Sequence, residues 1–424
     1  MSVLLRNATY IDWRTLEFRI TNILAEENRS SVTFVDDTPE AIRQHKPEVI
    51  DCDGKLVTKS FAVGHHHAYS ALSRGMGAPK KSPENFFEIL KYVWWTLDKC
   101  LDPEMIEASA LVTAIACAKA GSTFIIDHHA SPHSVKGSLE IIARAFEQAG
   151  VAHLLCYEIS DRDGLPVAAE GLDETSLYLE DHQGLVGLHA SFTVGDNTLK
   201  QAVELMNIYN SGIHLHVAED MYDQDVCLRE HRKRVVQRLS EAGVLDSPKT
   251  LLVHCLHLED NEREIIRKSP VWVVENSESN LNNNVGYFNG SGLGENIMLG
   301  TDGMHGDMLQ SAKAAFFTGQ RYDTINYASA YSRFRNVNRY LNDNHFNGDG
   351  DNNLVVLDYD PPTPVNSDNF NGHFLFGITS NHVRDVISGG RVIVRNRQIT
   401  TVNEADIMRN ARKQAERLWK KMSG

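Results

Sequence analysis

The sequence of 424 residues predicts an α/β fold, a (β/α)8 barrel of the TIM type with a small β-sandwich formed by both chain termini. Three observations predict it. Eight short apolar runs alternate with amphipathic segments between residues 59 and 344. Polar residues able to bind a metal directly follow five of these runs. The two ends of the chain instead carry short strand-like runs separated by polar turns.

The barrel strands and helices alternate in order along the chain. The predicted strands cover residues 61–65, 123–127, 152–157, 185–188, 212–217, 250–254, 271–274 and 297–301. The predicted helices cover residues 102–121, 137–149, 167–182, 197–209, 226–242 and 259–268. The first helix begins at Asp102, a capping residue, with Pro103 in its first turn. Eight strands is the number that this barrel requires.

The ends of the chain are expected to form one composite unit. Strand-like runs occur at residues 2–5, 32–35, 48–50, 354–357, 383–387 and 391–394. A polar, glycine-rich stretch at 342–353 is typical of a linker that returns from the barrel, and an amphipathic helix is expected from about 404 to 422. The sequence therefore predicts a β-sandwich with a C-terminal helix from residues 1–58 plus 345–424, and a barrel from 59–344.

Composition narrows the class of protein. No apolar run reaches the roughly 20 residues that a membrane span needs, and the first residues lack the features of a signal peptide. Six cysteines without paired spacing indicate reduced thiols, so we expect a cytoplasmic protein. A formal net charge of −14 argues against a nucleic-acid partner and favours a small neutral or cationic substrate. The sequence leaves the oligomeric state open, a homo-oligomer included.

Metal-binding side chains follow the predicted strands. Side chains at the carboxyl ends of parallel barrel strands converge on one mouth, and imidazoles with a carboxylate there form a transition-metal site. The candidates, in chain order, are His65, His67, His189, His214, His216, Glu219, His254 and Asp302. The alternative, eight scattered histidines and acids, does not explain five strand-end placements in one order.

These motifs resemble a known family. His-x-His after the first strand, His-x-His-x-x-Glu after the fifth, His after the sixth and Asp after the eighth are similar to the amidohydrolase superfamily, in its cytosine-deaminase-like and guanine-deaminase-like branch. The segments 68–76, 127–132, 189–194 and 358–364 resemble SsnA-type aminohydrolases more closely. The resemblance covers nearly the whole chain, and it implies the same barrel inserted into a terminal β-sandwich.

The resemblance implies a metal-dependent hydrolase. Members with two metal ions bridge them with a carbamylated lysine after the fourth strand, but this chain has His189 there and no lysine between residues 137 and 199. We therefore expect one divalent ion, held by His65, His67, His216 and Asp302 with one position left open for water. Zinc suits these ligands, and iron(II) or manganese would also fit.

The resemblance also implies roles for the neighbouring residues. Glu219 would protonate a ring nitrogen, and Asp302 and His254 would take the proton of the attacking water. The alternative for Glu219 is a solvated carboxylate beside Asp220. His189 and Arg162 are expected to contact the substrate, although a surface salt bridge is the more common role of a pair such as Glu158 and Arg162. His214 either contacts the substrate or holds a metal ligand in place. The alternative is that it is an interior histidine of the barrel.

The predicted reaction is hydrolytic deamination of an amino-substituted heterocycle of the purine, pterin, pyrimidine or triazine type. Cleavage of a cyclic amide or another leaving group, and a catalytically silent scaffold, are the alternatives. The chain departs from the family at Lys59-Ser60, where Pro-Gly is usual, and in the asparagine-rich segment 275–284, which is expected to reshape the pocket. The sequence leaves open the roles of His66, Asp127, His128 and His129.

Overall fold

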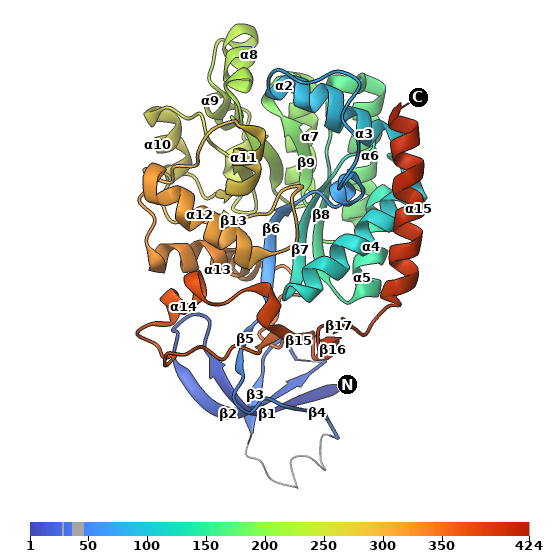
Figure 1. Ribbon diagram of the computed structural model, residues 1–424. Coiled ribbons are helices and arrows are strands. Elements are labelled where there is room, and N and C mark those ends of the chain that lie inside the picture. Colours follow the sequence, from blue (N-terminus) through green and yellow to red (C-terminus); the bar gives the residue numbers. More distant parts are fainter. Residues whose placement is uncertain (28, 36–45, 424) are drawn as a thin grey trace.

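The computed structural model describes residues 1–27, 29–35 and 46–423 and contains the predicted barrel (Figure 1). Eight parallel strands fall into two sheets. One sheet contains β6 (Phe61–His66), β7 (Ser122–His129) and β8 (Ala152–Tyr157). The other contains β9 (Val186–Ala190), β10 (Ile213–Val217), β11 (Leu251–His254), β12 (Trp272–Glu275) and β13 (Ile297–Leu299). The prediction of a barrel with eight strands is confirmed.

Isolated parallel bridges close the barrel at the two seams between these sheets. Ile159 pairs with Leu188 where β8 meets β9, and His66 pairs with Asp302 where the last strand meets the first. The backbone N–H of Asp302 donates to the carbonyl of His65 at 3.1 Å. Closure therefore places residues from the two ends of the barrel sequence side by side, at the mouth where the metal site is expected.

Helices surround the barrel, as predicted. They are α4 (Pro103–Lys119), α5 (Ser138–Ala149), α6 (Leu165–Asp181), α7 (Asp196–Ile208), α8 (Met221–His231), α9 (Val235–Glu241), α10 (Asp260–Lys268), α12 (Met308–Tyr322) and α13 (Tyr327–Asp343). All of the predicted helices but one lie within a few residues of an observed helix, and α12 and α13 had no predicted counterpart. The single helix expected over 226–242 is instead two helices, because Arg232 has a φ of 59° and ends α8 there.

Two short helical segments that the sequence did not predict lie at the mouth. The first combines α2 (Phe86–Ile89), a π-helical turn (Leu90–Trp94) and α3 (Trp95–Cys100). The second is α11 (Ser277–Asn283), which occupies the asparagine-rich segment. Each of these component helices has seven or fewer residues, too few for a helical repeat of apolar residues to be recognised. Both matter for function because they border the pocket described below.

Strands from both ends of the chain form one further sheet, which has nine strands among the described residues. They are β1 (Ser2–Ile11), β2 (Phe18–Glu26), β3 (Thr33–Val35), β4 (Glu48–Asp51), β5 (Leu56–Lys59), β14 (Leu354–Leu357), β15 (Val383–Ser388), β16 (Arg391–Arg395) and β17 (Gln398–Ile399). Antiparallel pairing of β14 with β5 joins the two ends. The division into 1–58 plus 345–424 and 59–344 stays a proposal.

The C-terminal helix α15 (Glu404–Ser423) lies against the flank of the barrel beside α4 (Figure 1). The indole N–H of Trp419 donates to the carbonyl of Leu72 at 2.8 Å, shortly after the first strand. A short helix, α14 (Phe370–Phe376), precedes β15. None of the helices in the described part of the chain is long and apolar enough to cross a bilayer.

Candidate active site

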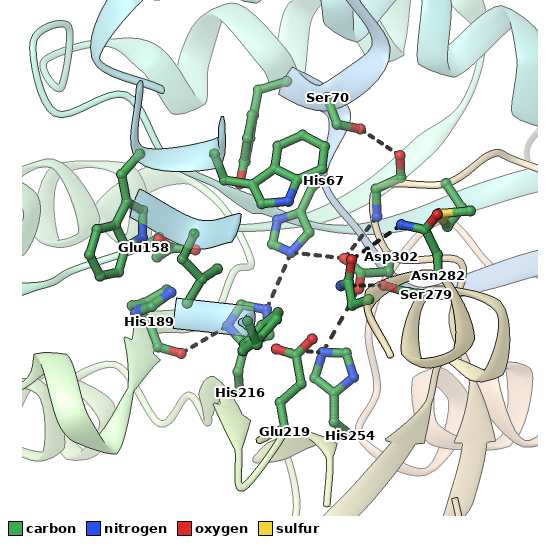
Figure 2. A pocket seen from close by; sticks show the side chains of 18 of the residues that line it. His67, Ser70, Glu158, His189, His216, Glu219, His254, Ser279, Asn282 and Asp302 are labelled. Carbon is green, nitrogen blue, oxygen red and sulfur yellow. Dashed lines mark hydrogen bonds and ion pairs between the residues drawn. The ribbon is translucent and has the colours of Figure 1, made fainter. Parts of the chain in front are cut away.

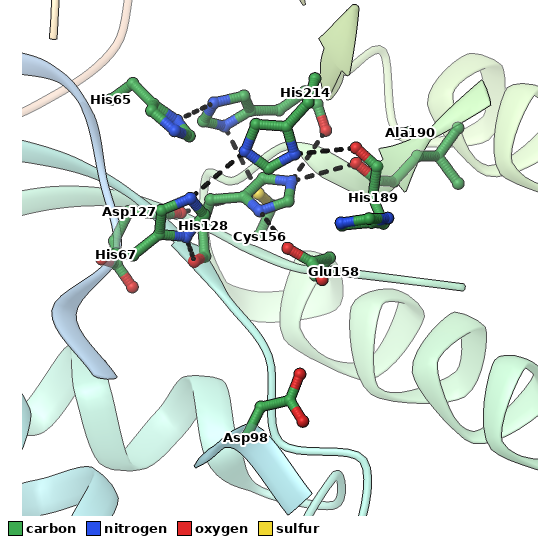
Figure 3. A network of polar contacts seen from close by, with 12 residues as sticks. His65, His67, Asp98, Asp127, His128, Cys156, Glu158, His189, Ala190 and His214 are labelled. Carbon is green, nitrogen blue, oxygen red and sulfur yellow. Dashed lines mark hydrogen bonds and ion pairs between the residues drawn. The ribbon is translucent and has the colours of Figure 1, made fainter. Parts of the chain in front are cut away.

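Four predicted ligands converge at the carboxyl end of the barrel. Figure 2 labels His67, His216 and Asp302, and Figure 3 labels His65. His67 Nε2 lies 3.2 Å from both His216 Nε2 and Asp302 Oδ1, and His65 Nε2 lies 3.8 Å from Asp302 Oδ1. All four residues are buried. The side chains come from β6, β10 and the turn after β13, so only the closed barrel brings them together.

The hydrogen bonds around the imidazoles fit a bound cation. His67 Nδ1 donates to the carbonyl of His128 at 2.7 Å, and His216 Nδ1 donates to the carbonyl of His189 at 2.8 Å. Each Nε2 is therefore left with a lone pair, and the two point at each other. His65 Nε2 is buried and has no hydrogen-bond partner among the described residues. Three such nitrogens beside a carboxylate are a donor set for a divalent metal ion.

His214 lies behind His65, inside the barrel (Figure 3). Its Nε2 is 2.9 Å from His65 Nδ1, and its Nδ1 is 3.4 Å from the thiol of Cys156. It is absent from the pocket lining. His214 therefore lies in the barrel interior and contacts a candidate ligand, and its predicted contact with substrate stays a prediction. Asp127 has a related place: its Oδ1 accepts the backbone N–H of Ala68, next to His67, at 2.7 Å.

Glu219 and His254 face the cluster from the other side. His254 Nε2 lies 3.5 Å from Glu219 Oε2 and 3.8 Å from Asp302 Oδ2. His254 Nδ1 bonds the side-chain oxygen of Asn280 at 2.8 Å, so Nε2 is an acceptor. Burial and the nearby Asp302 raise the pKa of Glu219 well above its usual value. Burial opposes ionisation of Asp302, but His67 and His254 hold its pKa below its usual value.

The backbone at these positions is strained. His254, Asp302 and Ala218 have φ values of 71°, 50° and 46°, in the left-handed region that non-glycine residues rarely adopt. Such conformations cost about 1–3 kcal/mol each and persist where the surrounding fold enforces them. Two of the three carry site side chains, and Ala218 immediately precedes Glu219. The strain therefore aims polar groups into the pocket.

A pocket of about 70 Å³ is lined by His67, His216, Glu219, His254 and Asp302. Aromatic and apolar side chains from the segment before α4 line its opening: Phe86, Leu90, Trp94 and Trp95. Ser279, Asn282 and Asn283 of the α11 region line it on another side. The sequence analysis expected the asparagine-rich segment to shape the pocket, but it missed the group from the segment before α4. The Trp94-Trp95 pair was the one visible signal, since adjacent tryptophans are uncommon outside cores and binding sites.

His189 and Arg162, predicted to contact substrate, also line this pocket. Burial lowers the pKa of His189 to about 3, so its ring is neutral near pH 7. Arg162 is paired with carboxylates: Nη2 with Asp98, Nη1 with Glu158 at 3.2 Å and Nε with Asp163 at 3.1 Å. The predicted alternative of a salt bridge with Glu158 is thus present. A direct contact between Arg162 and substrate stays a prediction.

Two of the histidines with open roles make local bonds. His66 Nδ1 lies 2.8 Å from Thr301 Oγ1, and His129 Nε2 lies 2.9 Å from Ser131 Oγ. Neither lines the pocket. His128 Nε2 contacts the carbonyls of Leu188 and His214 at 3.2 and 3.1 Å, while its Nδ1 lies 3.2 Å from Glu158 Oε2. His128 therefore links the pocket wall to the barrel interior.

Comparison with known proteins gives a family for the chain. The family model described as "Amidohydrolase family" matches residues 61–334. The 5-methylthioadenosine/S-adenosylhomocysteine deaminase of Thermoanaerobacter pseudethanolicus is 25% identical over 99% of this chain and 99% of its own length. The 5'-deoxyadenosine deaminase of Methanobrevibacter smithii is 25% identical over 88% of each chain.

Solved structures share the fold. An adenosine deaminase from Xanthomonas campestris with bound zinc has a TM-score of 0.83 at 17% identity, with 98% of each chain covered. An atrazine chlorohydrolase from Arthrobacter aurescens, complexed with zinc, has a TM-score of 0.80 at 14% identity, covering 97% of this chain and 100% of that one. Both likenesses extend over the barrel and the terminal sheet.

Proposed function

The chain belongs to the amidohydrolase family, and from that premise we propose that its pocket deaminates an amino-substituted heterocycle with one zinc ion held by His65, His67, His216 and Asp302. It is a hydrolytic enzyme of the aminohydrolase kind. The observation that carries the assignment of roles is the placement of Glu219 and His254, 3.5 Å apart, on the pocket side of the ligand cluster.

We propose zinc among the divalent ions because two solved structures with this fold contain it. Three imidazole nitrogens and one carboxylate oxygen are ligands that zinc accepts. A divalent ion bound there would supply charge that lowers the pKa of a water molecule and polarises the substrate. The described side chains can then do the proton transfers.

The proposed reaction adds water to the ring carbon that bears the amino group. His254 Nε2, an acceptor because Nδ1 bonds Asn280, and Asp302 take a proton from the attacking water. Glu219 donates a proton to the adjacent ring nitrogen, which makes the carbon more electrophilic. The proton taken from the water then passes to the amino group, which leaves as ammonia. The proton of the added hydroxyl returns to Glu219 as the oxo group forms, so the enzyme is restored.

The substrate proposal starts from the names of the relatives. Two of them are deaminases of adenosine derivatives, in which the leaving amine sits on a purine ring next to a ring nitrogen. In this proposal Glu219 protonates that nitrogen, whereas an open-chain amide would offer it no ring nitrogen. We therefore favour an amidine-like ring over an amide. We also propose a cytoplasmic location, in keeping with six cysteines that are all free.

The test is a panel of amino-substituted purines, pterins, pyrimidines and triazines, with released ammonia and zinc content measured on the same sample. We expect ammonia from at least one compound and about one zinc ion per chain. A zinc-loaded enzyme that gives no ammonia but cleaves a cyclic amide, or releases another leaving group, would overturn the deaminase proposal. A protein that purifies without metal and hydrolyses nothing would favour the silent scaffold.

A further inference from the structure

Glu158 and His189 form a polar wall across the pocket from His254 and Asp302 (Figure 2). Glu158 follows β8 and His189 lies in β9, so the seam between the two sheets places them together. Potential ligand atoms of Glu158, His189 and His216 all lie within 4.8 Å of one another. The wall is thus close enough to the ligand cluster for one small ring to touch both.

The hydrogen bonds of His189 make its free nitrogen an acceptor. The hydroxyl of Thr193 donates its one proton to the carbonyl of Ala190 at 3.1 Å. The same hydroxyl oxygen lies 2.7 Å from His189 Nδ1, so it must accept a proton from that nitrogen. His189 Nε2 then carries a lone pair. It can accept a hydrogen bond and cannot donate one.

Glu158 is the second acceptor. Its Oε1 takes one hydrogen bond from Arg162 and its Oε2 lies 3.2 Å from His128 Nδ1. A carboxylate offers about four acceptor positions, so two bonds leave it able to accept more. Glu158 lines the pocket, where a substrate is the available donor.

The cationic side chains near this wall are already paired with carboxylates. All three nitrogens of Arg162 pair with carboxylates, and its guanidinium lies 5.2 Å from the centre of the Trp95 ring. Nearby, Lys99 pairs with Asp163 at 2.7 Å. Among the described residues that line the pocket, a carboxylate or phosphate on a substrate would find no unpaired Lys or Arg, and an unpaired buried anion is strongly unfavourable. Arg162 beside Glu158 also disfavours a second metal ion.

Building on the proposed deaminase function, we propose that Glu158 and His189 select the substrate: they accept hydrogen bonds from two N–H groups of an uncharged heterocycle and disfavour anionic substrates. The substrate class is a compact ring whose edge away from the reacting carbon carries ring N–H or amino donors. Glu158 and His189 are then specificity residues, while Arg162 and Asp98 hold Glu158 in place.

The first test uses the unmodified zinc enzyme. Each heterocycle of the ammonia-release panel is compared with a carboxylated or phosphorylated counterpart and with an analogue N-methylated at the edge away from the leaving amine. We expect kcat/KM to fall by at least about 100-fold for the anionic counterpart. N-methylation should lower it about 10- to 100-fold. Equal or better turnover of the anionic compounds would overturn this proposal and leave the deaminase function standing.

The second test uses Glu158→Gln, with Glu170→Gln on the exposed face of α6 as the matched control. For the best uncharged substrate we expect kcat/KM to fall about 10- to 100-fold in Glu158→Gln, mostly through KM, and not in the control. The penalty for the N-methylated analogue should shrink, a readout that misfolding would not produce. A second zinc equivalent that disappears in Glu158→Gln would identify a metal site and overturn the proposal.

A panel that releases no ammonia at all tests the parent proposal separately. In that case, calorimetric binding of the same compounds to the zinc enzyme still decides between the two ideas. Preferential binding of uncharged ring donors would support the wall as a recognition surface without deamination. Tighter binding of their anionic counterparts would overturn it.

Discussion

His65 Nδ1 lies 2.9 Å from His214 Nε2, and this contact determines which nitrogen of His65 faces the ligand cluster. If His65 Nδ1–H donates to His214 Nε2, the buried His65 Nε2 keeps a lone pair for a metal ion. His214 then carries its proton on Nδ1, directed at the sulfur of Cys156, 3.4 Å away. The Cys156 thiol in turn donates to the carbonyl of Asp127. One consistent set of tautomers runs through the barrel interior.

We predict that His214→Leu weakens zinc binding about 10- to 100-fold, because partners of ligand histidines typically contribute that much to metal affinity. His214→Gln, which can place an oxygen acceptor near His65, should recover part of the loss. Chelator competition on the purified protein measures both. His153→Asn, a half-buried histidine outside the pocket lining, is the control. Unchanged zinc affinity in His214→Leu would show that His65 is oriented by other contacts.

Activity should depend on a zinc ion bound by the four predicted ligands. We expect one zinc ion per chain, loss of activity on chelation and recovery on adding zinc. His67→Ala should lose both metal and activity, since His67 Nε2 lies at the centre of the cluster, 3.2 Å from both His216 and Asp302. Elemental analysis of dialysed protein measures the stoichiometry. Two ions per chain would contradict the inference from the missing lysine.

A methyl group at Gly300 should disturb the site without changing any ligand. A Cβ there would lie 2.3 Å from Asn276 Oδ1 and 2.9 Å from His65 Cβ. We therefore predict that Gly300→Ala lowers the free energy of unfolding by about 1–3 kcal/mol and weakens zinc binding. Gly372→Ala is the matched control, because nothing lies within 4 Å of its Cβ position. Equal urea midpoints for the two variants would contradict this prediction.

The barrel could be predicted because its signal is repeated. Strand predictions such as 152–157 coincide with the observed element, since a buried parallel strand is a continuous apolar run bounded by turns. The candidate ligands could be identified because the polar residues that end such runs must meet at one mouth. The prediction of one continuous helix over 226–242 was wrong. The left-handed conformation of Arg232 ends the first helix, and the pattern of apolar residues does not indicate it.

Features made by tertiary contact could not be predicted in this way. The strained backbone of His254 and Asp302 depends on strand closure, and nothing local in the sequence requires it. The complete pairing of the Arg162 guanidinium with carboxylates depends on Asp98, which is 64 residues away in the chain. Asp98 lies in α3, a helix too short to be recognised from the sequence. The pairing of His214 with His65 spans 149 residues. Sequence reasoning could only leave its two roles open.

Acid should destabilise the protein partly through His153, a residue of β8 that does not line the pocket. Burial lowers the pKa of His153 to about 4, below the value of about 6.5 in an unfolded chain. The unfolded state therefore binds this proton more readily, and stability from the neutral ring is lost as pH falls from about 6.5 to 4. One proton contributes a slope of about 1.4 kcal/mol per pH unit.

We therefore predict that His153→Asn unfolds with a shallower pH dependence than the wild type over that range. Urea unfolding at several pH values measures the difference between the two proteins, in which the shared contribution of the site histidines cancels. Parallel curves from pH 7.5 to 4.5 would show that His153 keeps an ordinary pKa in the folded state.

The last prediction separates proton transfer from metal binding. Glu219→Gln keeps the shape of the side chain but removes the proton that the ring nitrogen needs. We expect full zinc content and a fall in kcat of about 10²–10⁴-fold on the true substrate. Glu230→Gln, an exposed carboxylate on α8, should behave as wild type. Because Glu219 lies 3.5 Å from His254 and is not among the four ligands, its loss should leave chelator competition unchanged. Near-normal turnover in Glu219→Gln would assign the acid role elsewhere, and loss of zinc would make Glu219 part of the metal site.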